Sequence, residues 1–129
     1  MTTELTMLAW TLVLALVQVS LPVLGKTVQY GSKWNAGPRD EPMPPPNKVT
    51  GRLDRAQANL FETLPVFIGA VLIAHVAGRE SAQTALGAEI FFWARVVYVP
   101  VYWAGIAGVR TGIWGVSIAG LAMMVSGLL

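Results

Sequence analysis

Residues 51–65, GRLDRAQANLFETLP, carry two arginines, an asparagine and a glutamate into a stretch that otherwise reads as membrane. On an α-helix these four positions fall at roughly 0°, 300°, 340° and 280°, an arc of about 80°. They therefore share one helix face. The four residues are Arg52, Arg55, Asn59 and Glu62.

A second polar group follows later in another apolar stretch. Arg95, Tyr98 and Tyr102 fall at roughly 0°, 300° and 340° on a helix and so share a face of their own. Arg110 comes shortly after them, near the end of the same predicted helix or in the turn that follows it.

The types of these residues indicate binding of an anionic small molecule that also carries an amine. Guanidinium groups bind carboxylates in bidentate geometry, and Glu62 could accept a hydrogen bond from an ammonium. A guanidinium or phenol beside a substrate thiol would favour the thiolate and so supply more nucleophile at neutral pH. In the alternative interpretation, Arg55 pairs with Glu62, or Arg95 with Glu89, and the pairs only hold the helices together.

The composition is that of an integral membrane protein. Hydrophobic residues make up 54% of the 129 residues and charged residues 12%, with a mean hydropathy of +0.57, whereas about 25% of residues are charged in soluble domains. The length allows about four spans of about 20 residues each. We therefore expect an all-α membrane protein, a four-transmembrane-helix bundle formed by one domain over residues 1–129. The expected helices cover about 4–24, 52–77, 83–108 and 112–128.

Residues 25–50 are expected to form a long loop, because they contain five of the eight prolines in the chain, including three in a row. Tyr30 and Trp34 in this segment are suited to a membrane interface. The loop is either an interfacial connector or a lid over a site at the start of the second membrane helix.

Several classes of function are disfavoured. The chain has no cysteine, which excludes a disulfide, a cysteine nucleophile and a thiolate metal site. Its single histidine, His75, does not indicate a metal centre. The net charge of +2 comes without a basic stripe, so we expect no nucleic-acid partner.

The distribution of basic residues predicts the topology. Lys26, Lys33, Arg39 and Lys48 lie between the first two spans and Arg110 between the last two, whereas only Arg79 lies between spans two and three. By the positive-inside rule, both termini are on the non-cytoplasmic side and the two polar groups are in the cytoplasmic half. No lysine or arginine precedes Lys26, which favours a retained first span over a cleaved signal peptide.

These motifs resemble the MAPEG family, the membrane-associated proteins in eicosanoid and glutathione metabolism. The resemblance rests on residues 55–65, RAQANLFETLP, on Arg95-x-x-Tyr98-x-x-x-Tyr102, and on Arg110-Thr111 after them. It extends over almost the whole chain, and the short length resembles the bacterial branch of the family. For a bacterial member, the expected location is the inner membrane.

The resemblance implies a homotrimer that binds glutathione between neighbouring protomers. Glutathione would be held by Arg52, Arg55, Asn59, Glu62, Arg95, Tyr98 and Tyr102, and Arg110 would be the catalytic residue that stabilises the thiolate. The implied activity is that of a glutathione-dependent transferase or peroxidase. Its lipophilic second substrate, an electrophile or a hydroperoxide, would enter from the membrane lipids. The alternative is a non-catalytic trimeric membrane protein that binds an anionic ligand or a lipid head group at the same site.

Overall fold

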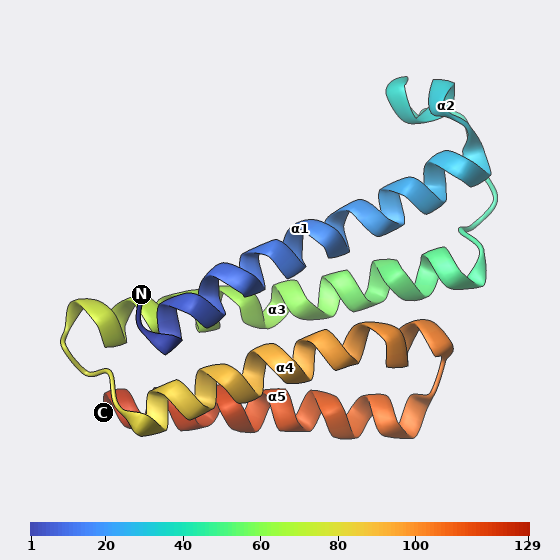
Figure 1. The fold of residues 1–129 in the computed structure, drawn as a ribbon. Coiled ribbons are helices and arrows are strands. Elements are labelled where there is room, and N and C mark those ends of the chain that lie inside the picture. The colour runs from blue at the N-terminus through green and yellow to red at the C-terminus, as the bar shows by residue number, and fades with distance from the viewer.

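The computed structural model describes all residues from 1 to 129 and contains helices only, in an antiparallel bundle (Figure 1). Four of its helices are long and apolar enough to cross a membrane, so the predicted all-α, four-span fold class is confirmed. The helices are α1 Thr3–Tyr30, α2 Ser32–Ala36, α3 Lys48–Val76, α4 Ala82–Ala104 and α5 Ala107–Leu128. Both termini lie at the same end of the bundle (Figure 1), which we call the termini end; the opposite end, with α2 and the α4–α5 turn, is the loop end.

The outer surface of the bundle is apolar, as expected for a protein surrounded by lipid. Large hydrophobic side chains point outward along the spans, among them Leu16, which is 70% exposed, and Trp93, which is 58% exposed. In water such a surface would be unfavourable by about 25 cal/mol per Å² of apolar area. The four spans therefore contact the hydrocarbon of the membrane directly.

The predicted loop over 25–50 is too long at both ends, because α1 continues to Tyr30 and α3 begins at Lys48. A helix does not have to end where its apolar run ends. Gly25 lets α1 approach α3 closely, since a Cβ there would lie 2.3 Å from Thr50 Oγ1. At the next residue of α1, Lys26 Nζ lies 3.2 Å from Asp54 Oδ2, one turn of α3 after Thr50. These contacts keep the extension of α1 helical beyond the membrane-spanning part.

The turn between the last two spans also lies earlier than predicted. The third span was expected to reach residue 108 and the fourth to begin at 112, but α4 ends at Ala104 and α5 begins at Ala107. Gly105 ends α4 in the left-handed conformation, with φ of 78°, and its N–H bonds the carbonyl of Tyr102. Glycine is favoured at this C-terminal position because it has no Cβ. Arg110 is consequently a residue of α5 and does not lie in a turn.

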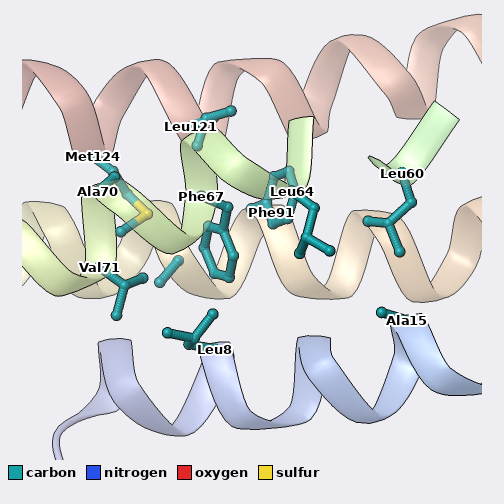
Figure 2. Packing of buried hydrophobic residues seen from close by; sticks show 11 residues of the cluster. Leu8, Ala15, Leu60, Leu64, Phe67, Ala70, Val71, Phe91, Leu121 and Met124 are labelled. Carbon is teal, nitrogen blue, oxygen red and sulfur yellow. The ribbon is translucent and has the colours of Figure 1, made fainter. Parts of the chain in front are cut away.

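A compact apolar core joins the four spans (Figure 2). Phe67 of α3 and Phe91 of α4 stack with their ring centroids 4.3 Å apart. Leu8 and Ala15 close the core from α1, and Met124 closes it from α5. The core occupies the middle and the termini side of the bundle, which leaves the loop end to polar side chains.

The backbones of α4 and α5 approach each other closely at two glycines. A Cβ on Gly87 would lie 2.6 Å from the carbonyl oxygen of Gly120, and a Cβ on Gly120 would lie 2.8 Å from that of Gly87. Small residues permit such contact in membranes, where van der Waals packing replaces the hydrophobic effect between helices.

Polar side chains at the termini end pair with one another. Glu4 is 3% exposed and its Oε1 accepts a hydrogen bond of 2.6 Å from Thr84. The hydroxyl of Thr2 donates to Glu80 at 2.5 Å, and His75 Nδ1 lies 3.3 Å from the same carboxylate. The beginnings of α1 and α4 are thereby fastened to the end of α3.

The glycine contact predicts a difference between two alanine substitutions on α5. Gly120→Ala is expected to lower stability by about 1–3 kcal/mol, because the new methyl group meets backbone atoms that cannot move freely. Gly115→Ala, whose Cβ would meet nothing within 4 Å, is the control and gains only helix propensity. Thermal unfolding in detergent measures both. Equal melting temperatures would contradict this packing.

The termini-end pairs predict a pH dependence. The hydrogen bond from Thr2 is the largest cause that lowers the pKa of Glu80 below its ordinary 4.5, with His75 acting in the same direction against some desolvation. The Glu80 carboxylate therefore stabilises the fold above about pH 4.5, and this contribution is lost as the pH falls through the lowered pKa. Glu80→Gln should lower the melting temperature at pH 7 and have little effect at pH 3. Glu41→Gln, in the exposed loop, is the control and should have no effect at either pH.

Candidate functional site

Three helices bring most of the predicted site residues together at the loop end. The beginning of α3 carries Arg52, Arg55 and Asn59, and the end of α4 lies beside it because the two helices are antiparallel. The contact is direct: Arg55 Nε donates to the Tyr102 hydroxyl at 3.1 Å. The two polar faces predicted from the sequence therefore meet in the structure.

Arg95 lies at the bottom of this cluster and is only 1% exposed. Its Nη1 donates to Asn59 Oδ1 at 2.8 Å, and its guanidinium carbon lies 4.2 Å from the ring centroid of Tyr98. Nε and Nη2 of the same guanidinium are buried and have no hydrogen-bond partner. A buried cation with unsatisfied donors is costly, so Arg95 has capacity for a further acceptor.

Arg52 lines the site and also contacts the end of α4. Its Nη1 donates to the backbone carbonyl of Trp103 at 3.2 Å, at the end of α4 where carbonyl groups lack helical partners. Gly105 makes room for it, since a Cβ there would lie 2.8 Å from the guanidinium. A cation at this end of a helix is also favoured by the helix dipole. Within one chain, Arg52 thus fastens the α4–α5 turn to α3.

Arg110 occupies the centre of the site. Its guanidinium carbon lies 4.7 Å from the ring centroid of Tyr102, and Tyr102 in turn packs 5.5 Å from Tyr98. Two cavities of about 200 and 250 Å³ meet at Arg110, which lines both of them. The first cavity is lined also by Asn59, Tyr98, Thr111 and Trp114, and the second also by Arg52, Arg55, Tyr102, Gly105 and Ala107.

Glu62 does not join the cluster within one chain. It is exposed, lines neither cavity and has no side-chain hydrogen bond or ion pair. The reason is its position on the helix, about 60° of rotation away from Asn59, which faces α4. Glu62 therefore lies on the outer face of α3, midway along a membrane-spanning helix.

The interpretation of the arginines as ion-pair partners within the chain is wrong. The two ion pairs of the structure join Lys26 to Asp54 and His75 to Glu80, and neither Glu62 nor Glu89 pairs with an arginine. The arginines of the site contact only an amide, a phenol, a backbone carbonyl and aromatic rings. None of these partners neutralises a positive charge, so the site is electropositive and suited to anions.

Trp114 and Thr111 line the first cavity but were not among the predicted site residues, although Thr111 belongs to the Arg110-Thr111 motif. The fourth span was expected to begin at residue 112 and to carry no site residue. The spacing could have indicated Trp114. It lies four residues after Arg110, and both belong to α5, so the two side chains share a helix face.

The loop does not cover these cavities within one chain. No residue between α1 and α3 lines either of them. The loop turns instead toward the end of α1, where Gln29 Nε2 donates to the carbonyl of Pro45 at 3.2 Å. The lid interpretation thus has no support from the contacts of a single chain.

Comparison with models of protein families gave a match to the MAPEG family over residues 7–129, nearly the whole chain. Comparison with curated proteins and with solved structures gave no match.

The buried contact between Arg95 and Asn59 predicts a stability coupling. Asn59→Ala should lower stability by about 1–3 kcal/mol, because it leaves another donor of a buried guanidinium unpaired. In an Arg95→Met background the same change should cost much less, and a double-mutant cycle measures the difference. Gln57→Ala, which removes no hydrogen bond, is the matched control. Additive effects of Asn59→Ala and Arg95→Met would contradict the contact.

Proposed function

This chain belongs to the MAPEG family, and on that basis we propose that it is an integral membrane glutathione-dependent transferase or peroxidase. Its second substrates would be lipophilic electrophiles or hydroperoxides. The observation that carries the proposal is the cluster of arginines around Arg110, none of which has a carboxylate partner within the chain.

The chemistry of the cluster fits glutathione. The tripeptide has two carboxylates, an ammonium and a thiol, and guanidinium groups are the side chains that bind carboxylates most specifically. Arg55 and Arg95 are the candidates for the carboxylates, because Arg95 has unsatisfied donors and Arg55 is exposed beside a cavity. Asn59, Tyr98 and Tyr102 would add neutral hydrogen bonds.

Glu62 supports assembly of several copies. An acidic side chain near the centre of a membrane helix costs about 2.5–3.5 kcal/mol when it faces lipid, and this one is exposed on α3. A neighbouring protomer would cover it, and glutathione bound between the protomers would supply an ammonium for the carboxylate. We therefore include in the proposal the homotrimer that is general for the family.

Arg110 is the proposed catalytic residue. Glutathione would supply a thiol whose ordinary pKa is near that of cysteine, about 8.5, and an adjacent guanidinium favours the thiolate. Tyr102 packs against Arg110 on one side and restricts its side chain to the junction of the two cavities. The thiol proton would pass to water at the loop end.

The loop end is the proposed cytoplasmic side, and the membrane is the proposed bacterial inner membrane. Lys33, Arg39, Lys48 and Arg110 all lie at this end, whereas Arg79 is the one basic residue of the α3–α4 turn. Such asymmetry favours retention of the basic end in the cytoplasm. The lipophilic substrate would reach the site laterally from the bilayer, between outward-facing apolar side chains.

Binding and turnover by an Arg110→Ala variant test the proposal. The wild type should bind glutathione in calorimetry and conjugate it to 1-chloro-2,4-dinitrobenzene, which is followed by absorbance. Arg110→Ala should keep its glutathione affinity within a few-fold and lose about 10²–10³ in kcat, the usual loss when one electrostatic stabiliser is removed. Arg79→Ala, at the termini end, is the control and should retain both properties.

The outcomes of these measurements distinguish a glutathione-dependent enzyme from a non-catalytic anion-binding protein. No binding by the wild type at millimolar glutathione would overturn the proposal. Binding without turnover of either an electrophile or a hydroperoxide would favour a non-catalytic protein that binds an anion at the same site. Full activity in Arg110→Ala would remove Arg110 from the mechanism while leaving the binding site intact.

A further inference from the structure

A larger cavity, about 680 Å³, lies at the loop end in the segment that joins α1 to α3. Its volume falls in the range of small-molecule sites, about 300–1,000 Å³. No residue lining it belongs to the arginine cluster. Six of its lining residues can recognise a ligand, two of them aromatic, two cationic and two anionic: Tyr30, Trp34, Lys33, Arg39, Asp40 and Glu41.

Hydrogen bonds hold the walls of this cavity in place. The Tyr30 hydroxyl donates to the carbonyl of Pro44, and the backbone N–H of Asn47 donates to Gln29 Oε1 at 2.9 Å. On the other side, Asn35 Nδ2 donates to Thr27 Oγ1 at 3.0 Å and fixes α2 against the end of α1. The prolines at 44–46 restrict the backbone between these attachments.

Arg39 is fixed more firmly than an exposed arginine usually is. Its Nε and Nη2 donate to Asn35 at 2.5–3.1 Å, and its guanidinium lies 5.3 Å from the ring centroid of Trp34. Its φ of 60° is positive, a strained conformation for a residue with a side chain. Nη1 has no partner within the chain, so two N–H groups remain for a ligand.

The charged side chains around the cavity do not neutralise one another. Neither Lys33 nor Arg39 forms an ion pair with Asp40 or Glu41, since both ion pairs of the structure lie elsewhere. Trp34 Nε1 is buried and also lacks a hydrogen-bond partner. The cavity thus offers donors for an anion and carboxylates for a cation, both near aromatic rings.

The cavity lies at the outer edge of the phospholipid head-group layer. The apolar run of α1 ends at Leu24, and Tyr30 follows six residues later, about 9 Å further along the helix at 1.5 Å per residue. The head-group layer extends about 5–8 Å beyond the hydrocarbon on each side. Figure 1 shows α2 just past this end of α1, away from the other spans.

We propose that this cavity binds the head group of an aminophospholipid, which carries a phosphate and a primary ammonium. Arg39 and Lys33 bind the phosphate, with Trp34 Nε1 as a further donor. Asp40 and Glu41 accept hydrogen bonds from the ammonium, which also contacts the faces of Tyr30 and Trp34. The proposal is independent of glutathione chemistry, because the two sites have no residue in common.

Binding of short-chain lipids to the full-length protein in detergent tests the proposal. The probes are the dihexanoyl forms of phosphatidylethanolamine, phosphatidylcholine and phosphatidylglycerol, measured by calorimetry. Phosphatidylethanolamine should bind about tenfold more tightly than the others, because a quaternary ammonium cannot donate a hydrogen bond and glycerol carries no positive charge. Equal affinity for the three lipids would overturn the assignment.

Variants test which residues bind the phosphate of the head group and which bind its ammonium. Arg39→Ala should weaken binding of all three lipids about tenfold, because it removes a charged donor to the phosphate. The double change Asp40→Asn with Glu41→Gln should weaken phosphatidylethanolamine alone by about the same factor. Lys48→Ala, an exposed cation at the same end that does not line the cavity, is the control and should change nothing.

Two further measurements make the result decisive. Circular dichroism and thermal unfolding should be unchanged in these variants, because the altered residues are exposed and outside the core. Wild-type affinity in Arg39→Ala would overturn the proposal. Glycerophosphoethanolamine, which has the head group without acyl chains, should bind much more weakly than the lipid; equal binding would overturn the assignment to a lipid.

Discussion

The burial of the Arg95 guanidinium among membrane helices is the constraint on which the site depends. A charge that is 1% exposed cannot be left to lipid, and its only hydrogen-bond partner within the chain is the amide of Asn59. That contact sets the register of α4 against α3. The same register places Arg55 beside Tyr102 and Arg52 at the end of α4. One buried cation thus determines where the other two arginines of these helices lie.

The charged side chains at the two ends of the bundle have different kinds of partner. At the termini end, Glu4 and Glu80 accept hydrogen bonds from threonines, and His75 lies beside Glu80. At the loop end, the arginines of the site have no acidic partner within the chain. A bundle that needed its charges only for assembly would have no reason for this difference. This asymmetry supports the proposal that a ligand binds at the loop end.

The sequence was sufficient to predict the fold class and the two polar faces, because both follow from periodicity: apolar runs long enough to span a membrane, and polar residues repeated every three or four positions. It did not predict how those faces meet. The packing of helices against one another determines that Glu62 faces away from α4 and that Arg52 contacts a helix end. The periodicity of one helix carries no information about that packing. The misplaced α4–α5 turn had a local cause, since Gly105, Gly108 and Gly112 are all plausible helix ends and only the first adopts positive φ.

The exposure of Glu62 links the fold to assembly. Within one chain this carboxylate faces outward from the middle of α3, while the arginines that would attract it point toward α4 and α5. Rotation of α3 to bring Glu62 inward would break the contact between Asn59 and Arg95 and leave the buried guanidinium without a partner. The same chain therefore cannot satisfy both groups. In the proposed oligomer a second copy would cover Glu62 and resolve this conflict. The electropositive cavities would then lie beside a carboxylate at a boundary between protomers, an arrangement that fits a ligand with two carboxylates and one ammonium.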